Sequence, residues 1–305
     1  MADVDTHLPD RGASKRARKS GRRKLPEWLA GNLLLAPTTV WFIFLLVIPT
    51  LLIAAYALGQ RGVIEPIRFS WGNLVWSNYS NALNPDFLPI FIRSIIYAFV
   101  ATLACVLIGF PLAYWIARFG GRFRNVFLVL VIIPFLTSYL IRTYGWLAIL
   151  QRNGLLNALL GRLGLGDNHT FLNTHFAVIL GLTYGFLPFM ILPLYASIER
   201  MDKSLVEASY DLGHGKASTL FRVIIPTVAP GLIAGVLLVF IPAVGDYITP
   251  ALLGGVKTQM IGTTIADQFG SGNNWPLGSA MSVLLMAFIL IGVFVYLRRV
   301  GEDAL

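Results

Sequence analysis

Long apolar segments dominate the chain, and shorter polar stretches separate them. A membrane-spanning helix needs about 20 mostly apolar residues. Stretches that meet this requirement lie at about 33–58, 92–117, 126–150, 175–198, 227–249 and 279–298. The strands of a membrane β-barrel are shorter and alternate in polarity, and a helix satisfies the backbone of such long segments in lipid. The pattern therefore predicts an all-α membrane protein with six transmembrane helices.

The composition favours the same class. Apolar residues make up 56% of the 305 residues and charged residues only 13%, whereas a soluble protein carries about 25% charged residues. The apolar segment 33–58 is far longer than the roughly 7–15 residues of a signal-peptide core, so we expect an uncleaved first span. Cys105 is the single cysteine, so no internal disulfide is expected. We expect Cys105 to be a small residue that packs in the core or faces lipid.

Basic residues are distributed unevenly along the chain, which carries a formal net charge of +9. If both termini share one side, that side holds 17 of the 24 Lys and Arg residues, and six lie on the other side. Cytoplasmic loops carry an excess of Lys and Arg. Both termini and the loop at 199–226 are therefore predicted to be cytoplasmic.

The first part of the chain is the most basic, with eight Lys and Arg residues between positions 11 and 24. Residues 1–28 are predicted to be a disordered cytoplasmic tail, and residues 29–305 to be the transmembrane domain. A nucleic-acid-binding arm is the alternative interpretation of a basic run. We disfavour it, and expect no nucleic-acid partner, because a basic segment just before an apolar span orients that span and suits anionic lipid headgroups.

The polar loop 199–226 is predicted to contain two short helices. Asp202 can cap the first helix, at about 203–212. Gly213 suits the left-handed conformation that ends a helix. The second helix is predicted at about 216–224. Such a compact helical projection could dock in a groove on a partner, and the alternative is an ordinary connection between two spans.

A motif in this loop points to a family. The sequence runs E-A-S-x3-G-x9-V-x-I-P from Glu207 to Pro226 and resembles the coupling loop of ABC importer permeases. Asp211 lies four positions after Glu207 and shares its helix face. The resemblance assigns ATPase coupling to Glu207, Ala208, Ser209, Asp211, Gly213 and Pro226.

A second region narrows the resemblance. The segments 240–255, 260–262 and 274–280 resemble the spermidine/putrescine permeases of type I ABC importers, specifically the B/H-type subunit. The resemblance covers the chain from about residue 30 to its end. Two departures are Ser209, where a second alanine is usual, and Asp246, where a glutamate is often found.

The resemblance implies a type I ABC importer permease fold whose cytoplasmic coupling loop lies between spans 4 and 5. It also implies import of putrescine or spermidine by alternating access across a bacterial inner membrane. The implied partners are a second, homologous permease in a heterodimer, an ATPase dimer and an extracytoplasmic substrate-binding protein.

No enzyme activity or cofactor is predicted for the chain itself. The segment 213–217 faintly resembles a phosphate loop but lacks the first glycine and the hydroxyl residue of that motif. The four histidines are scattered, and no catalytic triad or metal-ligand spacing is present. ATP and Mg²⁺ are therefore expected in the partner ATPase.

Two ionisable residues fall inside predicted spans, where such residues mark functional sites. Asp246 and Arg142 should lie at similar depth, so they could pair. Prolines and glycines around Asp246 favour a broken helix that exposes backbone carbonyls, and carboxylates, carbonyls and aromatic faces attract alkylammonium groups. The candidate pathway residues are Asp246, Tyr247, Arg142, Tyr139, Tyr144 and Trp146. The alternative is a buried pair that fixes helix packing, with the aromatics as packing residues.

Other functions remain as alternatives. The nearest is an ABC permease for another small solute, such as a different cation, an amino-acid-like compound or a metal complex; Arg142 even allows an anionic cargo. A secondary transporter, a channel or a membrane scaffold would need no ATPase. The coupling-like loop disfavours these classes, as does the lack of a clear repeat or of coupling-ion residues.

Overall fold

The computed structural model describes residues 27–62, 74–166 and 168–302. The chain divides into two units, Met1–Leu51 and Leu52–Leu305. The first contains α1 (Glu27–Phe42), a π-helical turn (Ile43–Val47) and the start of α2 (Ile48–Tyr56). The predicted tail lies almost wholly outside the described residues.

The described part of the chain contains four helices that are long and apolar enough to cross a membrane. The number rises to as many as six if each of two bent helix pairs counts as one span. The unbroken ones are Leu35–Tyr56, Leu88–Phe119 (α4), His175–Arg200 (α8) and Trp275–Tyr296, which is the main part of α15 (Trp275–Glu302). The third and fifth predicted spans are both interrupted.

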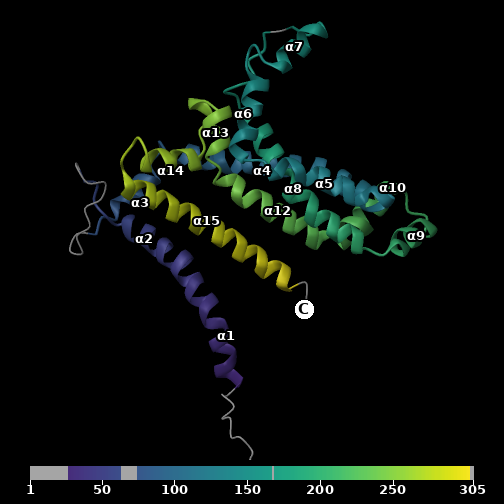
Figure 1. Cartoon of the computed structure of the whole chain (residues 1–305), viewed down its shortest axis with the longest axis horizontal. Helices are drawn as coiled ribbons and strands as arrows, with labels where there is room; N and C mark the ends of the chain where they lie inside the picture. Colours follow the sequence, from purple (N-terminus) through teal and green to yellow (C-terminus); the bar gives the residue numbers. More distant parts are fainter. Residues whose placement is uncertain (1–26, 63–73, 167, 303–305) are drawn as a thin grey trace, which may run out of the picture. The chain divides into compact units, whose positions relative to one another are not determined.

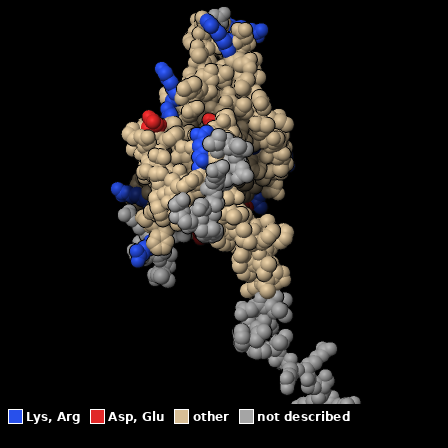
Figure 2. Space-filling model, turned by 90° about the vertical axis from the view of Figure 1, so that its left-hand side faces the viewer, with Lys and Arg blue, Asp and Glu red and all other residues tan. Residues whose placement is uncertain are grey.

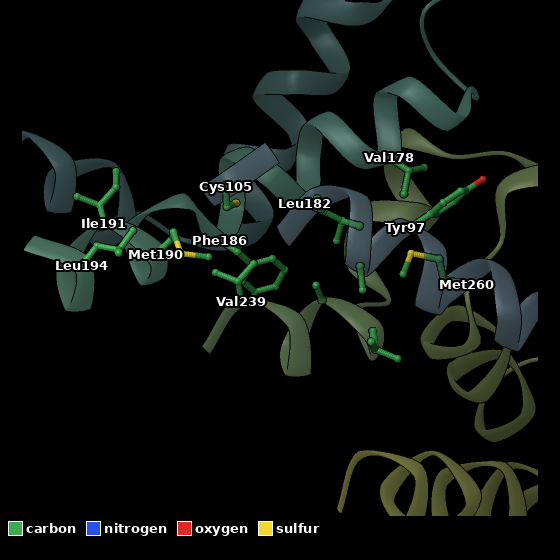
Figure 3. Close-up of a cluster of buried hydrophobic side chains, with 14 of the residues drawn as sticks. Tyr97, Cys105, Val178, Leu182, Phe186, Met190, Ile191, Leu194, Val239 and Met260 are labelled. Carbon is green, nitrogen blue, oxygen red and sulfur yellow. The ribbon is translucent and has the colours of Figure 1, made fainter. Parts of the chain in front are cut away.

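The core of the second unit is a bundle of α4, α8 and α12 (Ala229–Val244). Close approach of α12 to α8 requires small residues. A Cβ atom at Gly231 would lie 2.2 Å from Ser197 Oγ and 2.6 Å from the Pro193 carbonyl oxygen. Figure 3 shows the buried side chains between these helices, including Met190 and Val239.

Cys105 belongs to this core rather than to the lipid-facing surface. Its side chain is fully buried, and its Sγ atom lies 3.4 Å from the carbonyl oxygen of Thr183 on α8. The opposite side of α4 exposes large apolar residues such as Phe99 and Leu107. Figure 2 shows few charged side chains scattered over one face of the protein. Such a surface suits lipid or another membrane subunit.

Two helix breaks interrupt the third and fifth predicted spans. α5 (Arg124–Leu136) and α6 (Tyr139–Leu150) belong to helical segments that meet at 89°. α12 ends at Val244, and α13 (Ile248–Leu253) begins after a gap of three residues. The break near Asp246 was predicted from its prolines and glycines and is confirmed. The break at 137–138 was not predicted, and because of it the depth of Arg142 cannot be counted along one straight helix.

The smaller elements connect and flank this bundle. They are α3 (Ser77–Ala82), a 3₁₀ turn (Gly121–Phe123), α7 (Leu155–Arg162), a 3₁₀ turn (Val256–Thr258) and α14 (Ile261–Phe269). Figure 1 shows α13 and α14 toward one end of the bundle and α9 and α10 toward the other.

The polar loop forms the helical projection that the sequence predicts. α9 (Lys203–Asp211) and α10 (Lys216–Thr219) make up this projection, which we name the knob. The second predicted helix is wrong in one respect, because its last five residues, Leu220–Ile224, form a π-helical turn. This turn leads into α11 (Ile225–Thr227), which is part of a helical segment bent by 72° from α12.

Several arginines of the second unit bind backbone carbonyls or a carboxylate near the two ends of the bundle. Near the knob, Arg118 donates to the Met201 carbonyl oxygen at 2.9 Å, and Arg124 forms an ion pair with Glu199 at 2.8 Å. At the other end, Arg61 donates to the Gly272 carbonyl oxygen at 2.8 Å, and Arg93 donates to that of Gln259 at 2.8 Å. Arg68 lies outside the described residues.

Candidate functional site

The two helix breaks meet at a cluster of polar side chains. Tyr139 begins α6, and its hydroxyl donates to Asp246 Oδ2 at 2.7 Å. The same hydroxyl lies 2.6 Å from Thr249 Oγ1, and the Thr249 hydroxyl also donates to Asp246. We name Tyr139, Asp246 and Thr249 the break cluster. This contact joins the break in the third predicted span to the break in the fifth.

Asp246 also organises the backbone of its own break. Its Oδ1 atom accepts a hydrogen bond from the Ile248 N–H at 2.9 Å. The first N–H groups of a helix have no partner within the helix, so this bond caps α13. The carboxylate is therefore engaged by two hydroxyl groups and by the backbone N–H groups of Ile248 and, at 3.5 Å, Thr249, which satisfies a half-buried charge.

Glycines on α8 make room for the break cluster. A Cβ atom at Gly185 would lie 2.7 Å from the Tyr139 ring, and one at Gly181 would lie 2.6 Å from Thr249 Cγ2. The Tyr139 ring also packs near Phe186, at 6.0 Å between ring centroids. Both breaks can therefore sit directly against the central helix of the bundle.

Arg142 lies beside the break cluster but does not pair with Asp246. Its guanidinium carbon lies 5.5 Å from the ring centroids of both Phe135 and Tyr139, and its Nε atom is buried without a hydrogen-bond partner. Within the described ranges, the ion pair found is the one between Arg124 and Glu199. The suggested Arg142–Asp246 pair is thus absent, because hydroxyl groups occupy the carboxylate.

The other pathway candidates are dispersed. Tyr247 is exposed and lines a mainly apolar cavity of about 440 Å³ between the break, α14 and α15. Tyr144 is exposed on α6. Trp146 packs edge-on against Tyr184 of α8, at 5.4 Å between ring centroids. The structure therefore brings Tyr139, Asp246 and Arg142 together, but not Tyr144 or Trp146.

Sequence reasoning missed Thr249, Gly185 and Gly181. A signal for Thr249 was present, since a hydroxyl residue three positions after an aspartate at a helix start lies within reach of its carboxylate. The two glycines are spaced four apart on α8, which places them on one face of that helix.

The knob presents its acidic residues to the outside. Glu207, Ala208 and Asp211 are exposed on α9, and Pro226 is exposed in α11. Gly213 has φ +82°, and nothing lies within 4 Å of a Cβ atom built on it, so its role in ending α9 is purely conformational. These positions agree with the predicted first helix and with its predicted end at Gly213.

Ser209 differs from the other coupling candidates because it is buried. Its hydroxyl lies 2.9 Å from the Thr219 hydroxyl, which is also buried, and this bond joins α9 to α10. The residue that replaces the usual alanine therefore braces the knob from within.

Asp202 caps α9, as predicted. Its Oδ1 atom accepts a hydrogen bond from the Ser204 N–H at 3.0 Å. This backbone donor stabilises the charged carboxylate and holds the pKa of Asp202 below its ordinary value.

A small cavity links the knob to α4. It measures about 210 Å³, and Arg118, Lys203 and Glu207 contribute to its lining. Among the described residues, no group of three or more His, Cys, Asp or Glu side chains could hold a metal ion.

Comparison with known proteins gives these features a context. Residues 106–299 match the family described as the binding-protein-dependent transport system inner membrane component. The spermidine/putrescine transport system permease protein PotB of Haemophilus influenzae is 41% identical over 85% of this chain and 90% of its own length. PotB of Escherichia coli K12 is 39% identical over 85% of this chain and 93% of its own length.

The fold has relatives among solved structures. A chain of a bacterial alginate ABC transporter, crystallised in complex with a periplasmic protein that carries an alginate pentasaccharide, is similar with a TM-score of 0.64 at 19% identity. The similarity covers 90% of this chain and 95% of that one. The chain therefore belongs to the binding-protein-dependent transport system inner membrane components, the multi-pass permease subunits of ABC importers.

Proposed function

We propose that this chain is the permease subunit through which an ATP-driven importer carries putrescine and spermidine across a bacterial inner membrane. The observation that carries the proposal is the 41% identity to a spermidine/putrescine permease over 85% of the chain. The proposed complex contains a second, similar permease, an ATPase dimer that binds ATP and Mg²⁺, and an extracytoplasmic binding protein.

The proposed orientation places both termini and the knob in the cytoplasm. The grouping of basic residues supports this orientation, since Arg118, Arg124 and Lys203 all lie toward the knob. The break cluster then faces the external half of the membrane. Residues 1–28 form the proposed cytoplasmic tail, and residues 29–305 the transmembrane domain.

The knob is the proposed docking site for the ATPase. It is a capped helix with exposed carboxylates at Glu207 and Asp211 and a sharp glycine end. Such a projection fits the helix-in-groove mode of recognition. The bond between Ser209 and Thr219 keeps α9 and α10 together, so movement of the ATPase groove would be passed to α11 and α12.

The break cluster is the proposed contact for the passing polyamine. A primary ammonium group carries three donors and no acceptor, so it could replace both hydroxyl donors on Asp246. The faces of Tyr139 and the exposed Tyr247 would add cation–π attraction. In the present conformation the hydroxyls of Tyr139 and Thr249 occupy the carboxylate, so the proposed step requires these bonds to open.

A cargo of another charge is the competing proposal. Its support is the guanidinium of Arg142, which lies against the Tyr139 ring and has a buried Nε atom without a partner. An anionic solute would pair with that group, whereas a polyamine would be repelled by it and attracted by Asp246.

Uptake of labelled putrescine and spermidine separates these proposals. Cells with and without this chain would be compared, with the other transporter subunits present in both. Loss of uptake without the chain, restored by the wild type, is the expected result. Equal uptake in both strains would leave the family membership intact but would contradict the polyamine cargo.

A further inference from the structure

Arg142 carries a charge that this chain does not neutralise within its described residues. The Nε atom is buried and has no hydrogen-bond partner, and the group rests between the rings of Phe135 and Tyr139. Asp246 is the nearby carboxylate, but Tyr139, Thr249 and the Ile248 N–H engage its oxygens. Arginine inside a membrane protein pairs with an anion or faces water, because hydrocarbon does not solvate it.

The surface around Arg142 resembles a protein interface. Leu136 is 77% exposed, Ile141 is 68% exposed and Tyr144 is 51% exposed. Exposed apolar and aromatic residues close in sequence to a half-buried arginine are typical of the contacts that dominate binding between proteins. Lipid tails could cover these exposed residues, but they could not neutralise the guanidinium.

The bend between α5 and α6 explains why this surface is uncovered. The two helical segments meet at 89°, so the start of α6 turns away from the line of α5. On the bundle side of α6, Tyr139 fits against Gly185, and Trp146 and Leu150 pack against α8. The residues on the other faces of α6 are left for a partner.

We propose that a carboxylate of the second permease subunit pairs with Arg142, and that this pair anchors the contact between the two permeases. The inference rests on the proposed function, since the second permease is part of that proposal. Arg142 lies on the Tyr139 ring, and the Tyr139 hydroxyl donates to Asp246. Movement of the second permease would therefore act on the break cluster through two side-chain contacts.

Photo-crosslinking tests where α6 lies. Benzoylphenylalanine would replace the exposed Ile141 in the full complex, irradiated in native membranes with and without the external binding protein. The expected product joins this chain to the second permease in both samples. An adduct with the binding protein alone, or labelling of lipid alone, would overturn the proposal.

Charge reversal tests the ion pair itself. Arg142→Glu should lower recovery of the second permease with the tagged chain by at least about tenfold, because it places like charges in a buried contact. Arg142→Lys should retain most of the recovery. Arg162→Glu is the matched control, since Arg162 is an exposed arginine at the end of α7 in the same helical segment, and its recovery should equal that of the wild type.

Rescue completes the test. Each carboxylate in the spans of the second permease would be changed to arginine in turn, and one change should restore recovery of the Arg142→Glu chain. Full recovery of Arg142→Glu without any rescue would overturn the proposal.

Polyamine uptake by the wild type, measured in the same cells, distinguishes the interface proposal from the cargo proposal. Normal uptake with a failed crosslink overturns the interface alone, whereas absent uptake with a crosslink overturns the cargo alone.

Discussion

The break cluster and the knob are both polar regions of an apolar protein, yet their polar groups are used in opposite ways. In the break cluster, Tyr139 and Thr249 direct their hydroxyls to Asp246 against the bundle. On the knob, the carboxylates of Glu207 and Asp211 belong to exposed residues, and the internal bonds are made by Asp202 and Ser209.

This difference separates two kinds of functional residue. Among the described residues, no side-chain hydrogen bond or ion pair within the knob uses Glu207 or Asp211, so those carboxylates are available to a partner. The break cluster keeps its shape by means of the residues proposed to meet the cargo. Cargo binding at the break cluster must break existing hydrogen bonds, whereas the ATPase needs only to dock on the knob.

The largest expected effect follows from Asp246→Asn. Asparagine keeps one oxygen acceptor for the hydroxyls but loses the charge, and a hydrogen bond to a charged group is worth about 1.5–3 kcal/mol. Polyamine uptake should fall by about tenfold or more, while the amount of assembled complex stays the same. Normal uptake by this variant would remove the carboxylate from the pathway.

Gly185→Ala should disturb the break cluster without touching its polar atoms. The new Cβ atom would lie 2.7 Å from the edge of the Tyr139 ring, so the ring must move and its bond to Asp246 should weaken. We expect uptake to fall by roughly threefold to tenfold, in line with the loss of about one hydrogen bond. Gly145→Ala on α6, where nothing lies within 4 Å of the new atom, is the control and should transport normally.

Glu207→Lys tests the knob from outside. Reversal of an exposed charge at a docking surface should reduce recovery of the ATPase with the permease by roughly threefold to tenfold, with a strong dependence on salt. Thermal stability of the permease should not change. Asp86→Asn alters an exposed carboxylate before α4 and should leave ATPase recovery unaffected, and unchanged recovery in Glu207→Lys would contradict the docking surface.

Gly213→Ala tests whether the left-handed backbone conformation of residue 213, which ends α9, matters for coupling. The added Cβ atom meets nothing within 4 Å, so the expected cost is the left-handed strain alone, about 1–2 kcal/mol. Gly213→Asn should cost less, since asparagine tolerates this conformation. Equal ATPase recovery with glycine, asparagine and alanine would show that the φ of residue 213 is unimportant for coupling.

The smallest effect concerns pH. Because the folded-state pKa of Asp202 is lowered by the Ser204 N–H, its cap stabilises α9 above the unfolded pKa of about 3.9. That contribution is lost as pH falls through the lower folded value. Exchange of the Ser204 amide hydrogen should lose protection in acid, and Asp202→Asn should remove this dependence. Protection that is the same in both chains at every pH would contradict the cap.

The knob was predictable because its signals are local. A cap at Asp202, a glycine at 213 and the order of short helices are readable along the chain, and only the π-helical turn at Leu220–Ile224 departs from them. The break cluster was predicted in part. Asp246 and its broken helix follow from nearby prolines and glycines.

The partners of Asp246 were not predictable in the same way. Tyr139 reaches it across 107 positions of sequence, and this contact depends on the 89° bend and on space at Gly185. The suggested pair between Arg142 and Asp246 is absent for the same reason. Counting residues along a helix estimates depth, but it does not show that the hydroxyl groups of Tyr139 and Thr249 bind the Asp246 carboxylate.

The most direct test measures labelled spermidine imported and ATP hydrolysed in the same proteoliposomes, for the wild type and for Asp246→Asn. If the break cluster acts on cargo and the knob on the ATPase, the variant should retain ATPase activity that responds to the external binding protein, while import falls about tenfold. Import and hydrolysis that remain at wild-type levels in the variant would contradict the account.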